Sequence, residues 1–391
     1  MKAVGLAAMV LLIAACGSVS TAAHPSPSPS TQFSPQPSPN PDLLVATLEA
    51  KGTANPWTYN TVVITDLRGS VKAQATFDPL PTPALGCMGA ILPPMAHVVG
   101  NRVYYADGHG TIRTLAPDGS TATVARLPLT SAQQMLSFAI SPDASRLLGA
   151  IFTAPANAFP CDGSQPTGSY SYAAYSGPVG GSMQLVAHQT WASVPQVMAF
   201  TGWDAVGPVG SYPSVWASQG GGPASTLGVK ARIDPVTLRA TELGSSGSCL
   251  VWDSNATGSY VCEVVPATLD AQQKVQTRIS VRAPDGHEDW GFTVTDENEA
   301  SRPFLSPGGE HVVVCCSFDP QSEFVYARDG GHRLLAGRFS ADGWLDANAV
   351  YGWTDATNEN PHGVVAYVAL NAPDTIVRLG LSGQVVGSLS A

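Results

Sequence analysis

The chain has 391 residues, only 12% of them charged, and a formal net charge of −10 at pH 7. An acidic chain without a basic run argues against nucleic acid as a partner, because phosphate binding needs a positively charged surface. Its 39 glycines, 32 prolines and 44% hydrophobic residues, without a sustained helical stripe, indicate an all-β protein of short strands and tight turns.

Residues 1–16, MKAVGLAAMVLLIAAC, have the charge of Lys2 ahead of an apolar run and small residues, which is the pattern of an export signal. The end of this stretch, LIAACG, resembles the lipobox of bacterial lipoproteins, where the signal peptidase cleaves before a cysteine whose thiol is lipidated. The resemblance implies that residues 1–15 are a signal peptide and that Cys16 carries a lipid. The alternatives are a secretory signal with an incidental cysteine, or a membrane span, for which the run is too short.

Residues 17–42 are rich in proline and serine, as in HPSPSPSTQFSPQPSPNP. Such a segment cannot build a core, and its alternating prolines hold it extended. In polyproline geometry, at about 3.1 Å per residue, it could hold a domain up to on the order of 80 Å from a membrane. We therefore expect residues 16–42 to be a lipidated stalk and the folded domain to begin at residue 43.

From residue 43 onward, strand pairs around Gly or Asp turns recur along the chain. Seven hairpins are expected, at residues 62–77, 111–127, 183–197, 231–243, 279–294, 324–339 and 375–389. Their turns lie about 44–53 residues apart, except for one gap of about 70, and such a period is the signature of β-propeller blades. The sequence predicts seven four-stranded blades over residues 43–391, with these hairpins as outer strands. Eight blades would require another hairpin within residues 153–181.

The inner strands carry an internal repeat. Residues 137–152, SFAISPDASRLLGAIF, and 302–316, RPFLSPGGEHVVVCC, share a strand, a Ser-Pro turn and a second strand, and an APDG turn precedes each. These turns resemble the repeats of WD40-like, TolB-like propellers. The resemblance implies a propeller but no single function, since the family includes scaffolds, periplasmic assembly factors and propeller halves of peptidases. One terminus is expected to complete the sheet of the other and close the ring, and the shared strand stays open.

Six cysteines follow Cys16, and disulfides are expected because an exported protein meets an oxidising compartment. Cys249 and Cys262 flank a short hairpin loop in a register that places them opposite each other, so a cross-strand disulfide is expected. Cys87 and Cys161 lie in loop-like sequence and form the next pair by elimination.

No metal, cofactor or catalytic residue is assigned. Adjacent cysteines at 315 and 316 leave a vicinal disulfide or two buried thiols open. The acidic residues 295–299 lack the spaced ligand loop of a calcium site. The serine-hydrolase elbow G-x-S-x-G is absent, and its nearest approximation, residues 244–248, is interpreted as a loop. Three Asp–His pairs lie at Asp-Gly turns or beside them, where the dipeptide is favoured for its backbone angles: Asp107–His109, Asp285–His287 and Asp329–His332.

The long gap between hairpins places about 20 surplus residues within 153–181. Tyr170, Tyr172 and Tyr175 lie there among Gly, Ser and Pro, a mixture typical of adaptable binding loops. We expect these tyrosines to contact a partner at one rim of the ring, with an unpartnered surface insertion as the alternative.

Together these features predict a monomeric propeller, lipid-anchored at the outer face of the cytoplasmic membrane, that acts as a binding or scaffold module for an envelope protein or glycan. A non-enzymatic role is favoured because no catalytic constellation is apparent. The alternative is a hydrolase or lyase with its site in the propeller channel. Two facing carboxylates there would favour the enzyme.

Overall fold

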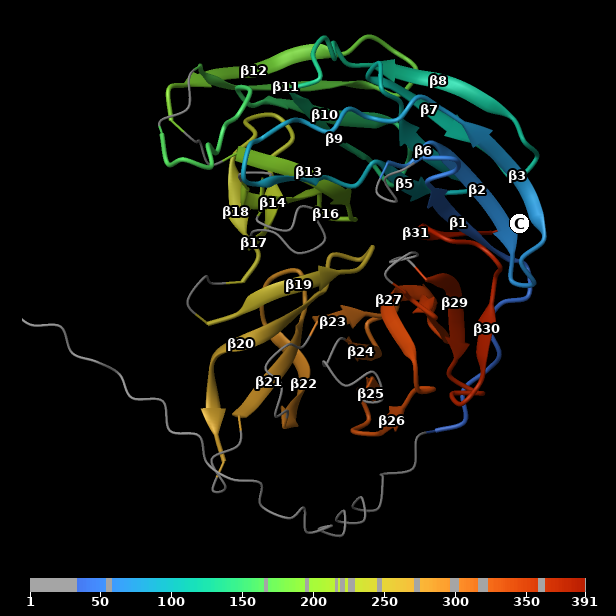
Figure 1. The fold of residues 1–391 in the computed structure, drawn as a ribbon. Coiled ribbons are helices and arrows are strands. Elements are labelled where there is room, and N and C mark those ends of the chain that lie inside the picture. Colours follow the sequence, from blue (N-terminus) through green and yellow to red (C-terminus); the bar gives the residue numbers. More distant parts are fainter. Residues whose placement is uncertain are drawn as a thin grey trace, which may run out of the picture.

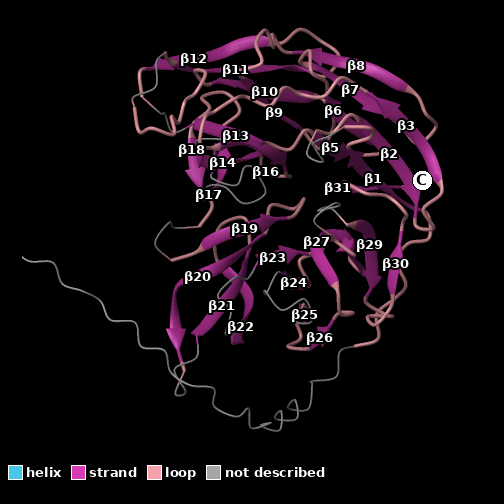
Figure 2. Cartoon of the chain, viewed as in Figure 1, coloured by secondary structure: helices cyan, strands magenta, loops and turns pink. Residues whose placement is uncertain are grey.

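The computed structural model describes residues 34–53, 58–164, 168–193, 197–214, 217–218, 222–223, 229–244, 248–270, 275–295, 302–315, 323–357 and 363–390. Every regular element in these ranges is a β-strand, as Figure 2 shows, so the expected all-β class is confirmed. No helix in the same ranges is long and apolar enough to cross a membrane. The export signal and Cys16 lie outside the described residues.

Seven antiparallel four-stranded sheets surround a common centre, which confirms the seven-bladed propeller (Figure 1). From the innermost to the outermost strand, blades 1 to 3 are β31 (Gln384–Ser390), β1 (Leu43–Glu49), β2 (Thr61–Asp66), β3 (Val71–Thr76); β5 (Ala96–Val99), β6 (Arg102–Ala106), β7 (Thr111–Leu115), β8 (Thr121–Arg126); β9 (Gln134–Ile140), β10 (Arg146–Thr153), β11 (Tyr170–Pro178), β12 (Gln184–Trp191).

Blades 4 to 7 follow in the same order around the ring. They are β13 (Val197–Trp203), β14 (Pro208–Ser214), β17 (Val229–Ile233), β18 (Ala240–Glu242); β19 (Leu250–Ser254), β20 (Tyr260–Leu269), β21 (Val275–Arg282), β22 (Glu288–Thr295); β23 (Arg302–Leu305), β24 (His311–Cys315), β25 (Phe324–Ala327), β26 (His332–Leu334); β27 (Phe339–Asp346), β28 (Ala349–Thr354), β29 (Val364–Ala369), β30 (Ile376–Arg378).

The ring closes through the C-terminal strand. β31 pairs antiparallel with β1, from Leu43 opposite Ser390 to Leu48 opposite Gln384. All seven residues of β1 are buried, as expected for a strand with neighbours at both edges. The last strand of the chain is therefore the innermost strand of the first blade, and this answers which strand is shared.

Five of the seven expected hairpins are outer strand pairs, and two are not. Residues 183–197 join the outermost strand of blade 3 to the innermost strand of blade 4, because the outer pair of blade 3 is β11 and β12. Residues 375–389 join β30 of blade 7 to β31 of blade 1. Both corrections have one cause: a strand that ends a blade and a strand that begins the next read like a hairpin in sequence.

The repeated Ser-Pro turns hold the inner strand pairs. The buried hydroxyl Oγ of Ser141 accepts a hydrogen bond from the backbone N–H of Arg146, the first residue of β10. Ser306 does the same for His311, the first residue of β24. A buried acceptor at this position satisfies a backbone donor that the turn leaves unpaired, which explains why the same residue recurs.

Turns that join the first to the second and the third to the fourth strand of a blade lie at one end of the ring, named here the turn end. The other connections lie at the loop end, because neighbouring strands alternate in direction. At the loop end the segment between blades 1 and 2 carries β4 (Gly89–Leu92), which pairs with β15 (Ala217–Ser218) and β16 (Gly222–Pro223) of the loop in blade 4. This segment buries Leu85 among side chains of blade 3.

Candidate functional site

Three consecutive innermost strands bring charged side chains together near the axis of the ring. β19, β23 and β27 belong to blades 5, 6 and 7 and contact one another in that order (Figure 1). They carry Asp253, Arg302 and Asp342, whose charges act on one another. With Tyr351 of β28 these residues form what we call the channel cluster.

β-bulges place both carboxylates. The pairing of β19 with β20 shifts between Val251 and Asp253, and that of β27 with β28 shifts between Ala341 and Gly343. A bulge bends a strand and re-aims its side chains, so each Asp lies where the regular pleat is interrupted. At Gly343, with φ of 151°, a Cβ would come within 2.7 Å of the Tyr351 hydroxyl, so glycine allows this ring to approach the bulge.

Burial sets the electrostatics of the two carboxylates. Removal from water raises the pKa of Asp342 to about 7, the negative charge of Asp253 raises it further, and Arg302 acts in the opposite direction. Burial also raises the pKa of Asp253, while Lys230 and a hydrogen bond from the backbone N–H of Leu305 (3.0 Å) lower it. Near neutral pH Asp342 can therefore act as either a proton donor or an acceptor.

Two tyrosines extend this environment. The pKa of the Tyr351 hydroxyl is raised well above its ordinary value, first by burial and then by the charges of Asp342 and Asp253. Burial raises the pKa of Tyr59, which precedes β2, and Asp342 adds to the rise. Both hydroxyls stay protonated at physiological pH and can donate hydrogen bonds. The arrangement can bind a ligand with hydroxyl or amide groups, or transfer a proton to one.

No local motif in the sequence marks the channel cluster. Asp253 and Asp342 belong to different blades, and each stands in an ordinary strand sequence, VWDS or SADG. Their proximity follows from ring closure and from two bulges, and neither is encoded in a local spacing. A blade alignment that marked the fourth residue of each innermost strand could have found both aspartates.

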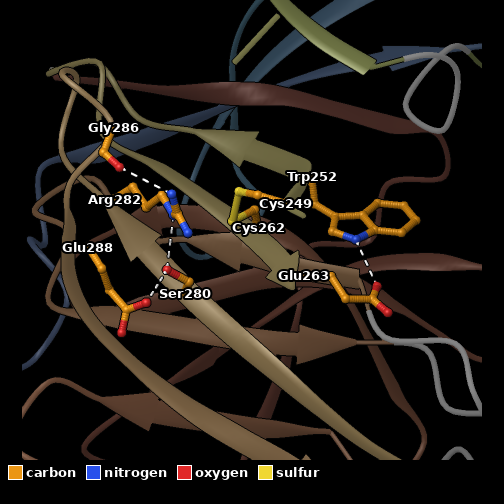
Figure 3. The surroundings of a disulfide bond; sticks show 8 residues. All are labelled: Cys249, Trp252, Cys262, Glu263, Ser280, Arg282, Gly286 and Glu288. Atoms are coloured by element: carbon orange, nitrogen blue, oxygen red, sulfur yellow. Dashed lines mark hydrogen bonds between the residues drawn. A yellow bond between two sulfur atoms is a disulfide. The ribbon is translucent and has the colours of Figure 1, made fainter. Parts of the chain in front are cut away.

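Both expected disulfides are confirmed. Cys87–Cys161 and Cys249–Cys262 have Cα–Cα distances of 5.0 Å and 5.4 Å. Figure 3 shows the second within blade 5. Its expected register is wrong, because Val251 and not Cys249 is the strand partner of Cys262.

The Cys87–Cys161 disulfide has a different role from the buried one. It ties the segment that carries β4 to the loop between β10 and β11, and Cys87 N–H also donates to the carbonyl of Phe159 at 2.8 Å. Both cysteines are exposed. The loop end is thus fastened over blade 3 by a covalent link from a segment between blades 1 and 2.

The three tyrosines do not lie in a surface loop. They belong to β11, where Tyr170 is 1% and Tyr172 9% exposed. The Tyr170 hydroxyl donates to the carbonyl of Ala158 at 3.2 Å, and its ring stacks on Phe152. Tyr175 is half-buried against the core. The expected rim location is wrong because YSYAAYSGP alternates as a strand between neighbouring blades, and the segment outside the strands lies before Tyr170.

The Asp–His pairs lie in different blades and serve local structure. Asp107 Oδ1 accepts from the backbone N–H of His109 and of Thr111, and Asp285 Oδ1 accepts from the N–H of His287. Within the described ranges, no three His, Cys, Asp or Glu side chains gather as a metal site would require. Cys316 and residues 296–299 lie outside those ranges.

Comparison with known proteins finds no matching family model and no matching curated protein. Among solved structures, an oligogalacturonate lyase in complex with manganese matches with a TM-score of 0.45 and 10% identity, over 87% of this chain and 90% of that one. TolB from Acinetobacter baumannii matches with a TM-score of 0.37 and 14% identity, over 88% of this chain and 82% of that one. The Pyrococcus horikoshii acylaminoacyl peptidase matches with a TM-score of 0.47 and 14% identity, over 87% of this chain and 51% of that one. These similarities assign no ligand or activity to the chain.

Proposed function

We propose that this protein is a lipid-anchored binding or scaffold module of the cell envelope, and that its ligand site is the channel cluster. One observation carries the proposal: three consecutive innermost strands place the partly buried Asp253, Arg302 and Asp342 where the charges of Asp253 and Arg302 act on Asp342. Burying ionisable side chains costs free energy, and strongly perturbed pKa values gather at functional sites. A hydroxyl-bearing ligand, as offered by a glycan or a protein side chain, matches the donors and acceptors of this group.

Channel variants test the binding proposal. We expect Arg302→Gln and Asp342→Asn to lose retention of glycans or proteins from envelope fractions on the immobilised full-length protein. Asp118→Asn is the matched control, because this carboxylate is exposed on a turn of blade 2. Equal retention by the channel variants and the control would show that the ligand binds elsewhere.

The anchoring part of the proposal rests on Cys16 and on the proline-rich stalk. The described end of the stalk runs along the turn end of blades 6 and 7. There the Ser34 hydroxyl donates a hydrogen bond to Asp329, and the backbone N–H of Asn40 donates one to Asp346 at 3.0 Å. We expect Cys16→Ala to move the protein from the membrane fraction to the soluble extracytoplasmic fraction. Variant protein that resists extraction from membranes by carbonate would contradict the lipid anchor.

A hydrolase or lyase in the channel is the second candidate, and the influence of the Asp253 charge on Asp342 favours it. Asp342, with a pKa near 7 beside Asp253, is suited to general acid–base catalysis at neutral pH. An enzyme would release products from envelope glycans, and Asp342→Asn would stop that release while binding persists. If the protein binds glycans but releases no products at any pH near neutral, the binding or scaffold role stands and the enzyme is ruled out.

A further inference from the structure

A pocket between blades 4 and 5 lies away from the channel cluster, at the turn end of the ring. Its volume is about 740 Å³, within the range of about 300–1,000 Å³ usual for small-ligand sites. One wall is the turn between β17 and β18 with β18 itself, and the other is the turn between β21 and β22. Buried Ile233, Leu243 and Tyr260 line it as an apolar floor.

Three arginines and three carboxylates line this pocket, and two of the arginines supply its available donors. Arg239 and Arg282 both line it, and neither has an ion pair with any residue the structure describes. A third, Arg232, is already paired with buried Asp204. Acidic residues outnumber basic ones in this chain by 29 to 19, yet Arg239 and Arg282 have no carboxylate partner among the described residues. Their guanidinium groups are therefore available to donate hydrogen bonds to a ligand.

The acidic residues of the lining are mostly engaged elsewhere. Asp234 Oδ1 accepts the backbone N–H groups of Val236 and Thr237 in its own turn, at 2.8 Å and 2.7 Å. Asp285 pairs with His287 at 2.6 Å. Glu242 is exposed on β18 and has no hydrogen bond or ion pair with the residues that the structure describes, so it can accept a ligand hydroxyl.

Arg282 is held in place before any ligand arrives. Its Nε donates to Ser280 Oγ at 3.3 Å and its Nη1 to the carbonyl of Gly286 at 3.2 Å, as Figure 3 shows. Ser280 in turn donates to Glu288 at 2.9 Å. These bonds use two of the five guanidinium N–H groups and leave the others for an oxyanion. An ordered guanidinium loses little conformational entropy when it binds.

We propose that this inter-blade pocket binds a small ligand bearing a carboxylate or phosphate group, which Arg239 and Arg282 hold together. Planar guanidinium groups match both oxyanions in bidentate geometry, and the pocket shields the contact from water on its apolar side. This is a second site, independent of the channel cluster, and it does not depend on the function proposed for the channel.

Calorimetric titration of the full-length protein tests this site, with citrate as the carboxylate probe and inorganic phosphate as the other. We expect saturable binding of at least one probe at low salt, and the stronger probe identifies the oxyanion. Arg239→Gln and Arg282→Gln should each weaken that binding by roughly tenfold or more. Arg68→Gln is the matched control, because Arg68 is exposed on a turn at the same end of blade 1.

Arg282→Gln also removes a bond to the turn of blade 5, so its thermal unfolding is measured alongside. Arg239→Gln is the decisive variant, because the Arg239 side chain has no hydrogen bond or ion pair in the described part of the chain. Unchanged affinity in Arg239→Gln, or no binding of either probe to the unmodified protein, would overturn the proposal.

Discussion

Removing residues 384–391 is expected to abolish the folded ring. This truncation takes away β31, the innermost strand of blade 1, and leaves the fully buried strand β1 with an unpaired edge. It also removes buried Val385 and Leu389, and the bond from Ser388 Oγ to the carbonyl of Leu345 in blade 7 (2.5 Å). Because β31 also contacts β5 of blade 2, it joins three blades. The free energy lost with it should exceed the net stability of a domain, about 5–15 kcal/mol.

Circular dichroism and analytical gel filtration of the truncated chain measure this outcome. A pair of point variants separates ring closure from a general effect of truncation. Leu389→Asp places an unpaired charge where the side chain is 2% exposed and should lower the unfolding temperature strongly, whereas Ser390→Asp, at an exposed position, should not. A truncated chain that melts cooperatively at the original temperature would show that β31 is dispensable.

The second large effect is a pH-dependent gain in stability in Asp342→Asn. The pKa of Asp342 is raised from 3.8 to about 7 on folding, so the folded protein binds more protons than the unfolded chain between these values. The stability of the original protein relative to the variant therefore falls as pH rises from about 4 to about 7. Above pH 7 the difference reaches on the order of 4 kcal/mol in favour of Asp342→Asn.

Comparing the two proteins isolates this contribution from other groups that titrate in the same window. Burial lowers the pKa of His97 to about 4, so His97 makes stability rise with pH between about 4 and its ordinary 6.5. That opposing effect is present in both proteins and cancels in the difference. Urea unfolding at pH 5 and pH 8 provides the measurement. An equal difference in stability at both pH values would mean that Asp342 has an ordinary pKa.

The architecture was largely predictable because propeller blades are encoded locally. Turn residues that recur about every 44–53 residues, together with apolar runs such as VVVCC, predict the number of blades without knowledge of contacts. The pair Cys249 and Cys262 was also within reach of sequence, since a short hairpin loop brings its ends together whatever the remainder of the chain does. The register of the two strands was not predictable, because Ser254 pairs with Tyr260 and the hairpin loop is therefore longer than the sequence suggests.

Features that depend on the closed ring could not be predicted. Residues 375–389 look like a hairpin, and only the geometry of closure sends β31 to blade 1. Tyr170 and Tyr172 look like loop residues because Gly, Ser and Pro surround them, but neighbouring blades bury them. The channel cluster forms because Asp253, Arg302 and Asp342 lie on the innermost strands of three successive blades. Their spacing in the sequence does not indicate that they are close in space.

The titration of Asp342 itself tests most directly whether the channel holds a desolvated polar site. The carboxyl ¹³C chemical shift of aspartate-labelled protein can be followed with pH and assigned by its loss in Asp342→Asn. We expect a midpoint at a pKa of about 7, set by burial and by the charge of Asp253. A midpoint near 4, the ordinary value of a carboxyl group in water, would contradict the channel site.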